Sequence, residues 1–207
     1  MNKDLTIVFS SYQSQHLLEG FLKEFDGKYK IIIIENSLDR SIKKKLESKF
    51  KNVEVIIPNK NLGLAKSYNL GIKKAKTKFI FLNNPDMIIK NQSIKNLIAC
   101  AKKIKKFGAI SPAYRNQKIF KNYEVFSKKK INKSALFKKF KIIEVDLLDN
   151  NFLVDKKQIR NSLFDENYFL YFERFDFTHN LAKQGKKIYV VKKIRFHHLG
   201  SSLRSEY

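Results

Sequence analysis

Four short apolar segments alternate with helix-like segments over the first half of the chain. The apolar runs cover residues 5–9, 31–34, 53–57 and 79–82, and they are rich in β-branched and aromatic residues. Between them, apolar residues recur every three or four positions, as in a helix that packs on one face. Strands that alternate with helices form a mostly parallel sheet flanked by helices. The sequence therefore predicts an α/β, Rossmann-like fold.

The second half of the chain continues this pattern less regularly. Helices are predicted over residues 94–104 and 173–183, and strands over 109–110, 142–147, 151–154, 188–191 and 194–196. Residues 111–141 are irregular and basic. No linker rich in Pro, Gly or Ser divides the 207 residues, so we expect a single domain.

Polar residues stand where the predicted strands of the first half end. Ser10, Glu35, Asn61 and Asp86 occupy such positions. Right-handed crossovers bring the carboxyl ends of parallel strands to one edge of a sheet, where α/β proteins bind their ligands. We therefore expect these four residues to converge on one site.

Asp86 is the main candidate at this edge, because it follows the central strand 79–82 and the pair Asn84-Pro85. A carboxylate held there is well placed to bind a divalent cation that carries a phosphate. The alternative is that residues 83–86 form only a turn, since Asn, Pro and Asp are common turn residues.

The composition narrows the possible partners and the location. The net charge is +24, but only six of the 43 basic residues are Arg, which sites that read nucleic acid favour. No nucleic-acid partner is therefore expected, whereas a solvated lysine surface and an anionic membrane partner both remain open. The single cysteine excludes an internal disulfide and a cysteine zinc cluster. With no apolar run near the ~20 residues that span a bilayer and no room for a signal peptide, a cytoplasmic location is expected.

A basic stretch covers residues 128–141. It contains seven lysines, with Leu136, Phe137 and Phe140 between them. Lysines around apolar residues suit an anionic lipid surface. We therefore predict peripheral contact with the inner face of the plasma membrane; a solvated loop is the alternative.

Seven motifs occur along nearly the whole chain in the order found in one enzyme family. The sequence resembles the family-2-type, rhamnosyltransferase-like nucleotide-sugar glycosyltransferases of GT-A fold. The segments that carry the resemblance are Ser11-Tyr12-Gln13, Glu35-Asn36-Ser37, Asn61 with Gly63 and Asn69, Asn84-Pro85-Asp86, Phe164–Glu173, residues 185–188, and residues 197–202.

The resemblance implies an inverting transfer of a sugar from a nucleoside diphosphate to a glycan or lipid-linked acceptor, in cell-surface polysaccharide synthesis. It implies a Mg²⁺ or Mn²⁺ cofactor held by Asp86, with His197 preferred to His198 as a further contact. Residues 1–112 would form the nucleotide-sugar-binding half and residues 113–207 the acceptor-binding half. The donor-binding residues would be Ser10, Tyr12, Glu35, Asn61, Gly63, Asn69 and Asn84.

Several of these residues also have structural explanations. Glu35 could instead cap the following helix, Asn69 could be a surface residue, and His197 could be a structural histidine.

The chain departs from the family at the position of the catalytic base. The family's Glu-Asp pair is Glu173-Arg174 here. On an ideal helix Arg174 points roughly 100° away from Glu173, so Glu173 can still serve as the base, with Asp176 on the same face as the alternative. Arg174 could instead pair with a neighbouring carboxylate or bind a diphosphate or an acidic acceptor. It also leaves open a binding protein that has lost catalysis. A basic nucleic-acid-binding module is favoured by charge alone.

Overall fold

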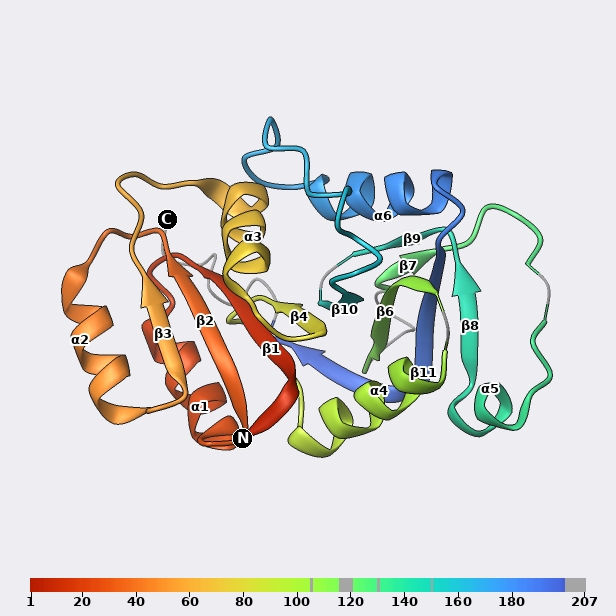
Figure 1. Ribbon diagram of the computed structural model, residues 1–207, viewed down its shortest axis with the longest axis horizontal. Helices are drawn as coiled ribbons and strands as arrows, with labels where there is room; N and C mark the ends of the chain where they lie inside the picture. Colours follow the sequence, from red (N-terminus) through yellow and green to blue (C-terminus); the bar gives the residue numbers. More distant parts are fainter. Residues whose placement is uncertain (105, 116–120, 130, 150, 200–207) are drawn as a thin grey trace.

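The computed structural model describes residues 1–104, 106–115, 121–129, 131–149 and 151–199. Its main element is a nine-stranded sheet in the order β3-β2-β1-β4-β10-β6-β11-β5, with β8 on the other side of β11. Figure 1 shows this sheet extending from β3 at one end of the molecule to β8 at the other. The strands are β1 (Asn2–Ser11), β2 (Tyr29–Glu35), β3 (Val53–Ile56), β4 (Phe79–Asn83), β5 (Met87–Ile88), β6 (Phe107–Tyr114), β8 (Ile142–Val145), β10 (Phe152–Asp155) and β11 (Lys187–His198).

The four strands predicted in the first half are confirmed. Strands β3, β2, β1 and β4 run parallel, and residues 31–34 are all buried because both faces of the sheet are covered. Strand β10 lies antiparallel between β4 and β6, so the second half of the chain enters the middle of the sheet. The chain therefore builds one continuous, mostly parallel sheet.

Helices cover both faces of the sheet, which gives two hydrophobic cores (Figure 1). One core receives residues of α1 (Gln15–Phe25), α2 (Arg40–Lys49), α4 (Asn91–Lys103) and α5 (Ala135–Phe140). The other receives residues of α3 (Gly63–Lys74) and α6 (Glu173–Lys183). No helix of the described residues has the length and apolarity that a membrane crossing requires.

The structure differs from the prediction in the second half. The segment expected to be irregular contains α5 and the strand β7 (Tyr123–Glu124), which pairs with β9 (Leu147–Leu148). The two strands predicted at 188–191 and 194–196 are one strand, β11. The register of its pairing with β6 shifts between Val191 and Arg195, so the polar residues between them lie within the same strand.

Candidate active site

The side chain of Asn36 joins the loops at the carboxyl edge of the sheet. Asn36 Nδ2 donates to Ser11 O at 3.2 Å and to Ser67 Oγ at 3.0 Å, and the backbone N–H of Asn36 also donates to Ser11 O at 2.8 Å. Asn36 Oδ1 accepts from Leu62 N at 2.9 Å. These bonds hold the ends of β1 and β2 against the start of α3, so three of the four loops predicted to converge meet here. Sequence analysis had not assigned a role to Asn36.

Glu35 is fully buried beneath this edge. Its Oε1 accepts from Ser37 N at 3.0 Å, whereas its Oε2 is buried without a hydrogen-bond partner among the described residues. The side chain does not cap the following helix, because Asp39 accepts from Ser41 N there. A buried acceptor without a partner costs about 1–3 kcal/mol, so a bond from an N–H or O–H would stabilise Glu35 Oε2, but a ligand reaches this oxygen only if the side chains that cover it move.

Other predicted donor-binding residues surround this point. Ser10 is half-buried, and its Oγ accepts weakly from Asn36 Nδ2 at 3.4 Å. Tyr12 is 53% exposed, so its ring is available to a ligand. Asn61 Oδ1 accepts from Gly63 N at 2.9 Å and closes the turn that leads into α3.

Asn69, one of the predicted donor-binding residues, holds a loop in place. Its Nδ2 donates to Phe164 O at 2.9 Å and to Glu166 Oε1 at 3.0 Å, and its Oδ1 accepts from Phe164 N at 2.9 Å. The residue is buried, and both ends of its amide hold the loop of residues 161–172 against α3. These bonds give Asn69 a structural role, and a contact with the donor stays a prediction.

Gly63 fixes the other end of this loop. The residue has φ +70°, and an added Cβ would lie 2.3 Å from Phe169 O. The same carbonyl accepts from Leu64 N at 2.7 Å, at the start of α3. Only glycine allows both this backbone conformation and this close approach.

Gly63→Ala should therefore destabilise the protein by about 2 kcal/mol, through left-handed strain and displacement of the loop. Thermal unfolding would measure the loss, and limited proteolysis should show new cleavage within residues 161–172. Gly20→Ala is the matched control, because Gly20 lies in α1 with nothing within 4 Å of an added Cβ. Its effect should be neutral or slightly stabilising, since Ala is the better helix former. Equal effects of the two substitutions would contradict the role given to Gly63.

Asp86 and His198 meet beside the end of β4. Asp86 lies in the turn between β4 and β5, which Met87 N closes by donating to Asn84 O at 3.1 Å. Strand β5 pairs with the end of β11, where Met87 stands opposite His198. This pairing brings His198 Nε2 to 2.9 Å from Asp86 Oδ2.

The preference for His197 as the metal contact is wrong. His197 is exposed and stands opposite Ile88, which is also exposed. Side chains alternate between the two faces of a strand, so the β5–β11 register decides which histidine faces Asp86. Residues 200–202 of the predicted tail motif lie outside the described residues.

The residues at this point fit a divalent cation that is carried by a diphosphate. Asp86 Oδ1 is buried without a hydrogen-bond partner among the described residues, although 29% of the side chain is exposed. No group of three or more His, Cys, Asp or Glu side chains suited to a metal exists among the described residues. The protein would thus supply two ligands, and phosphate oxygens and water would supply the others, as is usual for Mg²⁺ at nucleotide sites.

A buried group of charges lies at the start of α6. Arg174 Nε is 3.1 Å from Asp149 Oδ1 and 3.4 Å from Glu173 Oε1. Glu173 is fully buried and Arg174 is 11% exposed, so the two side chains share the interior. Arg174 therefore does not point away from Glu173 as the ideal helix predicts, whereas the expected alternative, a pair with a neighbouring carboxylate, is what the structure shows. Asp149, which follows β9, provides the opposite charge that a buried guanidinium requires.

Tyr68 connects this group of charges to the turn that carries Asp86. Its hydroxyl donates to Asn84 Oδ1 at 2.7 Å. Burial strongly raises the pKa of Tyr68, the charges of Glu173 and Asp86 raise it further, and Arg174 opposes them. Tyr68 therefore stays a neutral hydrogen-bond donor, and the buried charges and the Asp86 turn form one electrostatic site.

Three carboxylates near the start of α6 differ in access. Burial raises the pKa of Glu173, against the effect of Arg174, and the side chain reaches no solvent. Asp176 is half-buried on the outer side of the helix, where Asn180 Nδ2 donates to it at 3.0 Å. Asp149 is 22% exposed beside Arg174. Sequence analysis missed Asp149; the one available signal was that a buried Arg174 would need a carboxylate partner.

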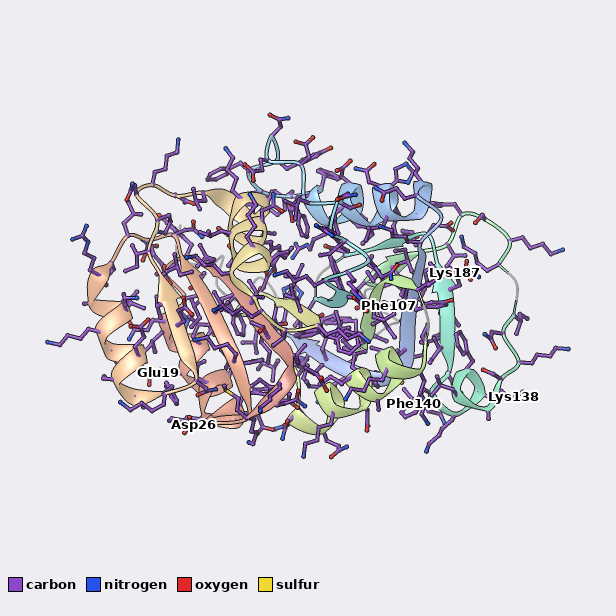
Figure 2. All side chains as sticks on the ribbon, in the orientation of Figure 1. Glu19, Asp26, Phe107, Lys138, Phe140 and Lys187 are labelled. Atoms are coloured by element: carbon purple, nitrogen blue, oxygen red, sulfur yellow. The ribbon has the colours of Figure 1, made fainter. Side chains whose placement is uncertain are left out.

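The three apolar residues named in the predicted membrane contact of the basic stretch 128–141 face the interior, whereas Ile131 of the same stretch is 84% exposed. Phe137 is buried in the core, and Leu136 and Phe140 pack against the same core. Figure 2 labels Lys138 and Phe140 of α5 at the end of the molecule that lies far from Glu19. The apolar residues of the predicted membrane contact, Leu136, Phe137 and Phe140, therefore pack inside the protein. Their helical spacing places them on the side of α5 that faces the sheet.

The chain matches one family model, Glycosyl transferase family 2, over residues 6–163. No curated protein matches it in sequence. Among solved structures, it is similar to GalNAc-T7 with UDP, GalNAc and Mn2+ (TM-score 0.72, 15% identity, 94% of this chain and 43% of that one). It is also similar to the mannosyltransferase PcManGT from Pyrobaculum calidifontis in complex with GDP-Man and Mn2+ (TM-score 0.71, 10% identity, 96% and 57%).

A third similar structure is S. aureus TarS 1-349 in complex with UDP, with TM-score 0.66, 18% identity and coverage of 94% of this chain and 60% of that one. The chain therefore spans roughly half the length of these proteins. These likenesses confirm the predicted GT-A-like α/β fold. Because the family model matches most of the sequence, the chain belongs to glycosyl transferase family 2.

Proposed function

We propose that this protein transfers a sugar, with inversion, from a nucleoside-diphosphate donor to a hydroxyl group of a glycan or lipid-linked acceptor. The observation that carries the proposal is the Asp86–His198 pair, with the buried and unpartnered Asp86 Oδ1, at the edge where the strand-end loops converge. The bound UDP, GDP-Man and Mn2+ of the similar structures support it. A cell-surface polysaccharide remains the predicted product.

Residues 1–112 would supply the donor side of this proposal, together with His198 from the other half of the chain. Glu35 Oε2 would accept from an N–H or O–H of the nucleoside, and the exposed ring of Tyr12 would stack on the base. Ser10, Asn61, Gly63 and Asn84 would shape the remainder of the pocket. Asp86 and His198 would hold Mg²⁺ or Mn²⁺, which acts as a Lewis acid that neutralises the charge of the departing diphosphate.

The acceptor hydroxyl needs a base, because its own pKa lies far above neutrality. We assign this role to Asp149, since its carboxylate is partly exposed and adjoins the charges that surround Asp86. Arg174 would fix the orientation of Asp149, and the buried Glu173 would in turn position Arg174. This assignment replaces Glu173 as the first candidate for the base, and Asp176 becomes the alternative.

A binding protein without catalysis is the second candidate, and Arg174 is the observation that favours it. Both candidates require the donor site, but only the enzyme requires turnover. Release of the nucleoside diphosphate from a bound donor therefore separates them.

A thermal-shift screen against UDP-, GDP- and dTDP-sugars, including dTDP-rhamnose, tests the donor site. With Mn²⁺ and a donor at about 100 times its Kd, the melting temperature should rise by roughly 5–10 °C, because ligand binding stabilises by about 2.7 kcal/mol. Each component alone should give a smaller shift. If no nucleotide sugar shifts the transition with Mn²⁺, the proposed function is wrong.

A further inference from the structure

A large cavity lies at the opposite edge of the sheet from Asp86. It has a volume of about 1070 Å³ and is formed where α3 and α4 end, beside the start of β4 and the end of β10. Lys78 precedes β4 and Asp86 follows it, so the two sites are separated by the length of that strand, about 17 Å. The cavity is thus distinct from the proposed donor site.

The charged side chains that line the cavity are almost all positive. Eight basic side chains and one carboxylate, Asp155, line it among the described residues. Helix dipoles explain only Lys73 and Lys102, which lie in the last turns of α3 and α4. Other cations lie beyond the helix ends, at positions that no dipole accounts for: Lys76, Lys78, Lys106, Lys157 and Arg160.

The floor of the cavity is apolar. Ile72, Ala101, Ile104 and Ile159 are buried there, and Leu163 is 38% exposed at its side. Like charges gathered over an apolar floor repel one another, and an anion would relieve this repulsion. A soluble polyanion would use the cations alone, whereas an amphiphile would also cover the floor.

We propose that this cavity binds the phosphate headgroup of an anionic lipid, with the first part of the chain on the apolar floor. The volume is that of a ligand pocket, and lysine-rich surfaces attract anionic lipids. The lining contains one Arg and, among the described residues, no aromatic side chain, so it lacks the stacking groups with which proteins bind single-stranded nucleic acid. The lipid would hold the protein at a membrane by the edge opposite its donor site.

Cosedimentation with vesicles of phosphatidylcholine, with and without phosphatidylglycerol, tests the proposal. The test variant carries Lys76→Gln, Lys106→Gln, Lys157→Gln and Arg160→Gln, all at exposed positions. The control variant loses the same charge at Lys128, Lys133, Lys138 and Lys139, each also changed to Gln in the basic stretch. At about 1 kcal/mol for each cation near an anionic surface, the test variant should partition at least tenfold more weakly, and the control should stay near the wild-type protein.

A second variant tests the floor without changing the charge. Leu163→Ser should weaken the partition into phosphatidylglycerol vesicles several-fold, while circular dichroism and the melting temperature confirm that each variant folds. Equal losses in the two four-site variants would overturn the proposal, because they would show attraction by net charge alone. Stabilisation by inorganic tripolyphosphate without any binding to vesicles would also overturn it, because the ligand would then be a soluble anion.

Discussion

Asp86→Asn is expected to reduce sugar transfer to below about a thousandth of the wild-type rate, because the cation loses its charged ligand and the diphosphate its counter-charge. The fold should survive, since backbone bonds and the side chains of Asn83 and Tyr68 hold the turn. Nucleoside diphosphate release with Mn²⁺ present would measure the rate, and the melting temperature would confirm folding.

Asp26→Asn is the matched control for this substitution. Asp26 is an exposed carboxylate that follows α1, and it is labelled in Figure 2 far from α6. Its replacement removes the same charge and should leave turnover within about twofold of the wild-type value. A fully active Asp86→Asn protein would remove Asp86 from the donor site.

Asp149→Asn should lower kcat by about 10²–10⁴-fold while donor binding persists, because the amide keeps the shape of the side chain but accepts no proton. Asp176→Asn should retain turnover within about twofold, since Asp176 bonds Asn180 on the outer side of α6. Single-turnover kinetics with a saturating donor would separate the chemical step from binding. Loss of turnover in Asp176→Asn alone would transfer the role to that residue.

Glu173→Gln provides the internal comparison. Glu173 is fully buried behind Arg174, so its replacement acts through the position of Arg174 and should cost no more than about tenfold in kcat. If Glu173→Gln removes turnover and Asp149→Asn does not, Glu173 is the base and must become accessible during the reaction.

The strands of the first half could be predicted because they are buried on both faces and read as continuous apolar runs. Residues 31–34 and 79–82 show this directly, and their parallel order follows from the helices between them. Helix α5 was not predicted because it has six residues, too few for a pattern to stand out among lysines. The single strand β11 was read as two because the irregularity that joins its parts depends on pairing with β6.

The candidate site was predictable to the level of the loops but not of individual bonds. Which of His197 and His198 faces Asp86 depends on the register of β5 against β11, and β5 has only two residues. The role of Asn69 depends on Phe164, which is 95 residues away in the sequence. The direction of the Arg174 side chain could not be predicted, because it depends on Asp149, which lies on another part of the chain. Helical spacing gives no information about charges on other elements.

Binding of Mn²⁺ in the presence of UDP or GDP, followed by the loss of the electron paramagnetic resonance signal of free Mn²⁺, tests the central claim most directly. The adjacent histidines provide a matched pair, since His198 contacts Asp86 and His197 faces away from it. The wild-type protein and His197→Asn should bind the ion with the diphosphate, whereas His198→Asn and Asp86→Asn should each weaken binding at least tenfold. Full Mn²⁺ binding by His198→Asn together with its loss in His197→Asn would contradict the account.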